Sequence, residues 1–300
     1  MNRILSLFDC PLKDVKRLLP IIEKQGFNYV QISPMQKNKI SENDGWWLLY
    51  QPLGFEIGNK IGTKEELYDL CLEANKRGIN IIVDSVINHV ANKSDDEFLV
   101  PHPDTDIELL SNRECFKEAI QISDWNNRYQ VTNYCMGLPG LNPKSKIVQN
   151  KVSNMLNEYI ALGVSGFRFD AAKSIALPIE DCDFFEKVNY SLDKILPLIY
   201  GEVLFADEEL IKAYAKHMKV LTNSYVQNKD ILIKYIENKD SFLSKDLGYT
   251  KYWPKEKITR EYMELTRTYP NTLYYARNYT HDWYEWQSDG VREANKQKVR

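Results

Sequence analysis

The chain has 300 residues, of which 43% are hydrophobic and 27% charged, with only 13 glycines and 12 prolines. This composition is typical of a folded globular protein and excludes a disordered or collagen-like chain. The formal net charge of −3 at pH 7 provides no basic excess for binding nucleic acid or an anionic membrane surface. The 19 tyrosines and 6 tryptophans fit either an aromatic core or a surface that stacks on sugar rings.

The five cysteines are spread along the chain and form no CxxC pair, which argues against a zinc ribbon or a dithiol redox site. Their odd number and wide spacing favour reduced thiols and a cytoplasmic protein. The apolar stretch after Arg3 is shorter than the core of a signal peptide, and no apolar run approaches the length of a membrane-spanning helix.

Short apolar runs alternate with helical patterns along the chain. Strands are expected at residues 3–8, 27–32, 79–83, 164–169, 198–202, 219–223 and 273–277. Three of the intervening helices end at a glycine, namely Gly26, Gly78 and Gly163, which is a common helix stop. A capping box of Thr63 and Glu66 starts the second helix. Helix, glycine and strand in repetition predict βα units and, at this chain length, an α/β fold of the (β/α)8 TIM-barrel type.

Two irregularities interrupt this repeat. The long interval between Gly78 and Gly163 indicates a small domain inserted after the third strand, over residues 88–143, between barrel segments 1–87 and 144–300. Only seven strands are found, and the polar residues after Asp282 are too few for a crossover and an eighth strand. We therefore expect a barrel truncated after its seventh strand, whose open edges invite self-association.

Acidic residues follow four of the expected strands. Arg168 and Asp170 are two residues apart and point to the same side of their strand, into the barrel if the flanking phenylalanines face the helices. Asp84, Glu202 and Asp282 end or follow three other strands. Taken singly, each segment also fits a structural role, such as a buried ion pair or a turn. Together they predict a site, because strand ends converge at the C-terminal mouth of a barrel.

In this order, the segments 81–89, 166–173, 200–203 and 278–282 resemble the four signature regions of glycoside hydrolase family 13, the α-amylase family. Segments 47–52, 57–59, 62–63, 128–132 and 138–142 resemble further parts of the family, including its inserted domain B. The resemblance covers roughly residues 3–290 and is closest to bacterial saccharifying-type α-amylases.

The resemblance implies a role for each matching residue. Asp170 matches the nucleophile, Glu202 the general acid/base and Asp282 the carboxylate that stabilises the transition state. The residues that match substrate-binding positions are Trp47, Tyr50, Asp84, His89, Arg168, Lys173 and His281. Trp47 stands where close relatives have tyrosine.

A retaining glycosidase explains these residue types. It needs an ionised carboxylate as nucleophile and a protonated carboxyl as acid, about 5–5.5 Å apart. We expect Arg168 to lower the pKa of Asp170, and burial near two other acids to raise the pKa of Glu202.

The resemblance also implies a structural calcium ion, held in the family by the asparagine matching Asn88, an aspartate of domain B and a histidine carbonyl. This chain has Gln130 and Ser174 at the latter two positions, which weakens the site, and Asp124 is an alternative ligand. Calcium binding therefore stays open. His102 and His217 show no metal-ligand spacing and are expected at surface or core positions.

The leading hypothesis is retaining hydrolysis of α-1,4-glucosidic bonds in starch, glycogen or maltodextrins, with no nucleic-acid or membrane partner. One alternative keeps the fold and transfers the glucosyl unit to another sugar. Another is a truncated, inactive glycan-binding fragment, favoured by the missing eighth strand and the missing C-terminal β domain of amylases. The complete set of three acids argues against inactivity.

Overall fold

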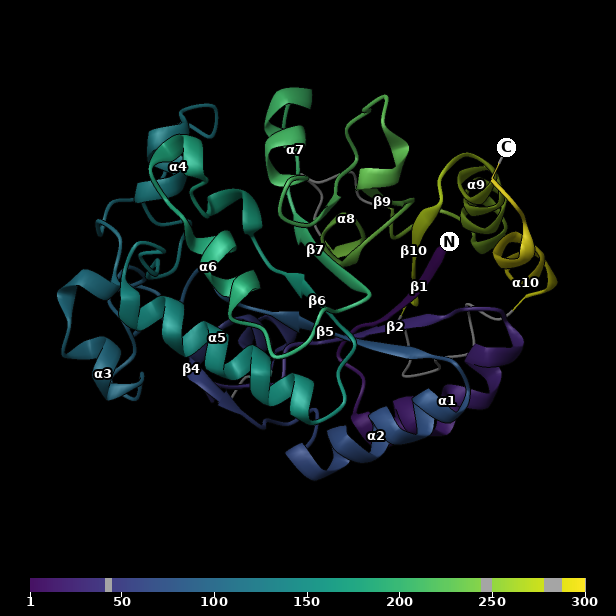
Figure 1. The fold of residues 1–300 in the computed structure, drawn as a ribbon, viewed down its shortest axis with the longest axis horizontal. Helices are drawn as coiled ribbons and strands as arrows, with labels where there is room; N and C mark the ends of the chain where they lie inside the picture. Colours follow the sequence, from purple (N-terminus) through teal and green to yellow (C-terminus); the bar gives the residue numbers. More distant parts are fainter. Residues whose placement is uncertain (41–44, 244–249, 278–287, 300) are drawn as a thin grey trace.

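The structure is a computed structural model and describes residues 1–40, 45–243, 250–277 and 288–299. Its centre is a closed barrel of eight parallel strands in the spatial order β1-β10-β9-β8-β7-β6-β5-β2 (Figure 1). The strands are β1 Asn2–Leu7, β2 Tyr29–Ile32, β5 Asn80–Ser85, β6 Gly166–Phe169, β7 Leu198–Glu202, β8 Lys219–Leu221, β9 Leu232–Tyr235 and β10 Asn271–Tyr275. Pairing of β1 with β10, in which Asn2 lies opposite Asn271, closes the barrel. The predicted fold class is thus confirmed.

Helices surround the barrel, and Figure 1 shows α1, α2 and α5 along one outer side of it. The longer helices are α1 Leu12–Lys24, α2 Lys64–Lys76, α5 Lys146–Ala161, α6 Phe184–Tyr190, α7 Glu208–Tyr214, α9 Lys255–Thr268 and α10 Asp289–Lys296, and the short helix α8 is Lys239–Leu243. In α1, the apolar face of Val15, Leu18, Leu19 and Ile22 is fully buried. Burial of such a face, rather than helix propensity, provides most of the stability of a helix in a protein.

The predicted helix boundaries are also present. Thr63 and Glu66 form the capping box at the start of α2, each side chain bonding the other residue's backbone N–H. Gly163, after α5, has a φ of +93°, and a Cβ there would lie 2.9 Å from the Cβ of Cys71. This position therefore requires glycine both for its backbone conformation and for the close approach of α2.

The prediction of a barrel open after seven strands is wrong, because β9 is a strand that the sequence patterns did not reveal. The connection between Leu221 and Leu232 contains only the short 3₁₀ turn η5 Lys229–Ile231, so the helix–glycine–strand repeat is missing there. With eight strands paired around the barrel, the predicted open edges and the self-association based on them lose their physical reason.

Two excursions lie at the C-terminal ends of the strands. After β2 the chain forms the antiparallel pair β3 Gln36–Asn38 and β4 Pro52–Ile57, with the 3₁₀ turn η1 Trp46–Tyr50 between them. Between β5 and α5 lies a longer segment with α3 Ile107–Leu110, η2 Arg113–Cys115 and α4 Arg128–Asn133, which we call the β5–α5 segment. None of the helices in the described ranges is long and apolar enough to cross a bilayer.

Candidate active site

The orientation of β6 directs Arg168 into the barrel. Its neighbours Phe167 and Phe169 are buried and point outward, where Phe167 packs against Tyr159 of α5 and Phe169 against Phe185 of α6. Because side chains alternate along a strand, Arg168 must then face the interior. The predicted orientation of this strand is confirmed.

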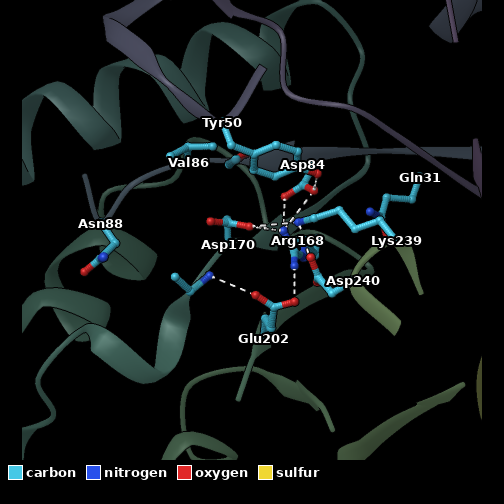
Figure 2. Close-up of polar contacts among 12 residues, drawn as sticks. Gln31, Tyr50, Asp84, Val86, Asn88, Arg168, Asp170, Glu202, Lys239 and Asp240 are labelled. Carbon is cyan, nitrogen blue, oxygen red and sulfur yellow. Dashed lines mark hydrogen bonds and ion pairs between the residues drawn. The ribbon is translucent and has the colours of Figure 1, made fainter. Parts of the chain in front are cut away.

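Arg168 is the centre of a buried charge cluster at the ends of three adjacent strands (Figure 2). Its Nη1 donates to both carboxylate oxygens of Asp84, at 2.7 and 2.9 Å, and to Oδ1 of Asp170 at 2.6 Å. Its Nη2 forms a short ion pair with Oε1 of Glu202, whose Oε2 accepts the Ala171 N–H at 3.3 Å. One guanidinium thus holds three carboxylates from β5, β6 and β7.

The two carboxyls proposed for chemistry have opposite pKa shifts. Burial would raise the pKa of Asp170, but the charges of Lys239 and Arg168 outweigh it and hold this pKa well below its usual range. For Glu202, burial outweighs the attraction of Arg168, and its pKa is raised. Both directions agree with the prediction from the sequence, and they give an ionised carboxylate beside a carboxyl that retains its proton more readily.

Lys239 and Asp240, at the start of α8, are site residues that sequence analysis missed. Nζ of Lys239 lies 3.3 Å from Oδ1 of Asp170 and 3.7 Å from the centre of the Tyr50 ring. Figure 2 shows both residues beside the cluster around Arg168. The sequence did contain a signal for this part of the site, because Asp240 follows the short apolar strand β9 as other acids follow their strands. It was missed because β9 was not predicted as a strand. Lys239 and Asp240 add one cation and one carboxylate to the site.

Tyr50 and His89 form one wall of the site. The Tyr50 hydroxyl donates to Oδ2 of Asp84 at 2.7 Å, which orients its ring. His89 Nε2 lies 3.0 Å from the Tyr50 carbonyl, and burial lowers the pKa of His89, so the neutral ring donates from Nε2. No described residue hydrogen-bonds the buried Nδ1 of His89, which is left as an acceptor.

The cluster opens into a cavity of about 810 Å³. Of the predicted site residues, the cavity is lined by Trp47, Tyr50, His89, Asp170, Lys173 and Glu202. Asp84 and Arg168 are buried beneath it, where they orient the lining residues. Trp46, Trp125, Phe205, Lys239 and Asp240 also line it and were not predicted. The predicted residues His281 and Asp282 lie outside the described residues.

Two of the predicted calcium ligands, Asn88 and Ser174, bind one amine, and the third, Gln130, is engaged elsewhere. Oδ1 of Asn88 accepts a hydrogen bond from Nζ of Lys117 at 2.8 Å, and the carbonyl of Ser174 accepts one from the same amine at 2.6 Å. Oε1 of Gln130 accepts hydrogen bonds from the backbone of Ser123 and Asp124. The described residues contain no cluster of three or more histidine, cysteine or acidic side chains that could hold a metal. The residues present therefore do not fit a calcium ion.

The two other histidines lie away from the cavity. His102 accepts the backbone N–H of Asp104, and His217 stacks on Phe185 behind β6. Neither lines the cavity.

A family model of the α-amylase catalytic domain matches residues 11–284 of the chain. An α-amylase of Clostridium acetobutylicum is 37% identical over 234 residues, which cover 74% of this chain and 30% of that protein. An α-amylase-related protein of Drosophila auraria is 35% identical over 185 residues, covering 58% of this chain and 37% of that protein. The chain thus spans only 30% and 37% of the length of these two relatives.

The fold is similar to that of solved α-amylases. The structure of the Geobacillus thermoleovorans α-amylase complexed with acarbose matches with a TM-score of 0.73 at 19% identity, covering 98% of this chain and 77% of that one. The family model covers most of the chain, and the strand-end acids lie together at the mouth of the barrel. The chain belongs to the α-amylase catalytic-domain family, glycoside hydrolase family 13.

Proposed function

We propose that the chain hydrolyses α-1,4-glucosidic bonds of starch, glycogen or maltodextrins with retention of configuration, with Asp170 as nucleophile and Glu202 as acid/base. One observation carries this proposal. A single buried guanidinium holds both carboxylates at an aromatic cavity, while the pKa of Asp170 is lowered and that of Glu202 raised. A retaining glycosidase needs this division between an ionised and a protonated carboxyl.

In the first step, Asp170 attacks the anomeric carbon of the bound glucose. Its Oδ1 is engaged by Arg168 and Lys239, and no described residue donates to Oδ2, which is the attacking atom. Glu202 gives its proton to the glycosidic oxygen as the carbon–oxygen bond breaks. The glucosyl unit is then bonded to Asp170, and the shortened glucan leaves.

In the second step, water replaces the carboxylate. Glu202, now ionised, takes a proton from water as the water oxygen attacks the anomeric carbon, and Asp170 is released. Two displacements on opposite faces return the original configuration. The separation of about 5–5.5 Å between the Asp170 and Glu202 carboxyls stays a prediction, as does the saccharifying subtype.

The family resemblance gives the role of third carboxylate to Asp282, which lies outside the described residues, and we propose Asp240 as a second candidate for it. Asp240 lines the cavity together with Asp170 and Glu202 and follows β9, so it extends the row of strand-end acids around the barrel. A carboxylate at this place stabilises the positive charge that develops on the sugar ring. Sugar recognition would come from the exposed ring of Trp47 and from His89, which also lines the cavity.

The position of Lys239 favours a second candidate function, glucan binding without turnover. Its ammonium group lies over the ring of Tyr50, which the family resemblance assigns to substrate binding, and contacts the nucleophile Asp170. A cation there competes with the sugar for this ring face and opposes the positive charge of the transition state. The hydrolase proposal requires Lys239 to move aside when substrate binds.

Incubation with maltohexaose, followed by product chromatography and NMR of the first-formed anomer, separates the two functions. Hydrolysis predicts shorter α-anomeric products from the parent chain and none from Glu202→Gln. Binding without turnover predicts a calorimetric binding signal with no product. β-anomeric products would contradict the retaining mechanism.

A matched pair tests the third carboxylate. Asp240→Asn should lower kcat about 10²–10³-fold, the usual effect of removing one group that stabilises transition-state charge. Asp282→Asn measures in the same way the contribution of the residue that the family resemblance matches to this role. A loss of that size in Asp282→Asn alone would give the role to Asp282 and exclude Asp240.

A further inference from the structure

Lys117 is a buried lysine without a carboxylate partner. Its side chain lies in the β5–α5 segment, the residue is only 6% exposed, and no salt bridge of this lysine occurs within the described ranges. Burying an amine without polar partners is costly, so its surroundings must supply hydrogen-bond acceptors. They do so with two neutral oxygens, the side-chain oxygen of Asn88 and the carbonyl oxygen of Ser174.

These contacts join three parts of the chain that are distant in sequence. Asn88 follows β5, Ser174 ends the 3₁₀ turn η3 Ala172–Ser174 after β6, and Lys117 is 29 and 57 residues away from them, respectively. Asn88 also accepts the Leu141 N–H through its backbone carbonyl. The amine of Lys117 thus ties the β5–α5 segment to the two barrel strands that carry Asp84 and Arg168.

The family resemblance places a calcium ion at the two oxygens that Lys117 binds. We infer that the side chain of Lys117 takes the place of this ion, so that the fold of this chain does not depend on calcium. The amine and the ion would perform the same task, bridging the inserted segment and the barrel. They cannot occupy the position together, because both need the same lone pairs of Asn88 and Ser174.

The oxygen atoms around this position suit an amine and not a calcium ion. Calcium takes six to eight oxygen ligands, carboxylates among them, at about 2.3–2.6 Å. The contacts of Asn88 and Ser174 are 2.8 and 2.6 Å long, and they are hydrogen bonds to a single nitrogen. At the position where the family has the charged aspartate ligand, this chain has Gln130. The side-chain oxygen of Gln130 accepts hydrogen bonds from a local turn. Among the described residues, the amine at this position binds these two neutral oxygens and no carboxylate.

The backbone around Lys117 also leaves room for the aliphatic part of its side chain. The Lys117 N–H donates to the carbonyl of Gly140 at 2.8 Å, and a Cβ at Gly140 would lie 2.8 Å from Cδ of the lysine. Glycine at this position leaves the path of the side chain open. Burial lowers the pKa of Lys117 to about 7, but two N–H donors suffice for both hydrogen bonds in either protonation state.

The experiment is thermal unfolding of the 300-residue chain in EDTA and in millimolar calcium. We expect the same Tm in both, and no calcium in the purified protein by elemental analysis. Lys117→Met should lower the Tm by about 3 °C or more, since two buried acceptors lose their partner. The matched control is Lys194→Met, an exposed lysine whose loss should leave the Tm unchanged.

Lys117→Asp tests whether the position itself is a cation site. It places a carboxylate beside the two freed oxygens, so calcium should raise the Tm of this variant and not that of the parent chain. A parent Tm that falls in EDTA would overturn the inference, and so would a Lys117→Met variant as stable as the parent. These two results decide the question even if Lys117→Asp does not fold, and neither depends on the proposed hydrolysis.

Discussion

Two buried cations, Arg168 and Lys117, join strand ends to one another in this molecule, and their surroundings differ. Arg168 contacts three carboxylates, Asp84, Asp170 and Glu202. Lys117 contacts only neutral oxygens. Both are nearly inaccessible to solvent. The first arrangement sets the protonation of its partners, whereas the second provides only a connection between segments.

This difference explains where chemistry can take place. A carboxylate near a buried cation changes its pKa, and several carboxylates around one cation are shifted by different amounts according to burial. Neutral oxygens do not titrate, so the partners of Lys117, unlike those of Arg168, supply no carboxyl group for acid–base chemistry. The charge cluster therefore lies at the cavity, and Lys117 lies at the joint that positions the β5–α5 segment.

The largest effect we expect is on stability at the charge cluster. Arg168→Met leaves three buried carboxylates without their cation and should lower the free energy of unfolding by about 3–5 kcal/mol. Lys117→Met leaves two neutral acceptors unpaired and should cost about 1–3 kcal/mol. Urea unfolding at pH 7 measures both, with Lys194→Met as the control. Equal losses would show that the partners' charges do not matter.

The sequence predicted the part of the site that a local pattern encodes. Arg168 alternates with two phenylalanines whose burial fixes its direction. Asp84 lies next to the last residue of β5 and Glu202 is the last residue of β7, each after apolar residues of its strand. In these cases a few consecutive residues determine both the strand and the direction of the charged side chain.

Contacts between distant residues could not be predicted in this way. The strand β9 follows a connection without an α-helix, so the barrel was expected to stay open and Asp240 was missed. Lys117 is one lysine in a segment without helical or strand periodicity, and its acceptors are remote in sequence. Only the folded chain shows that its amine reaches the expected calcium ligands.

A smaller effect should follow from neutralising Lys239. Lys239→Gln removes the ammonium that lies 3.3 Å from Oδ1 of Asp170, while the hydrogen bond from Arg168 to this carboxylate remains. Relief of repulsion in the transition state should raise kcat about tenfold, equivalent to about 1.4 kcal/mol. This is a fraction of the ~4 kcal/mol between unit charges 4 Å apart at an effective dielectric constant of 20.

Initial rates on maltohexaose measure this change, with Lys194→Gln as the matched control. A lower kcat in Lys239→Gln would mean that Lys239 assists the reaction instead of opposing it. A binding constant that tightens without any turnover would favour the glucan-binding function.

The smallest changes in stability are expected at Glu202 and Asp170, two carboxyls that contact the guanidinium of Arg168. The pKa of Glu202 is raised, so its ionised form is disfavoured in the folded state, and Glu202→Gln should stabilise the protein at pH 7 by about 0.5–2 kcal/mol while abolishing turnover. The pKa of Asp170 is lowered, so its ionised form favours folding, and Asp170→Asn should destabilise the protein at pH 7.

The pH dependence of these two differences follows from the directions of the shifts. The contribution of Asp170 is complete above its ordinary pKa of about 3.9 and is lost as the pH falls through its lower folded value. The penalty of Glu202 begins above its ordinary pKa of about 4.3 and grows until the pH passes its higher folded value. Urea unfolding between pH 3 and pH 8 should therefore show the two variants differing from the parent in opposite directions at high pH. Glu202→Gln should approach the parent below about pH 4.3, whereas the deficit of Asp170→Asn should only begin to shrink below about pH 3.9. Variants that shift stability in the same direction would show that Arg168 does not separate the two carboxyls, and the proposed division into nucleophile and acid would lose its electrostatic basis.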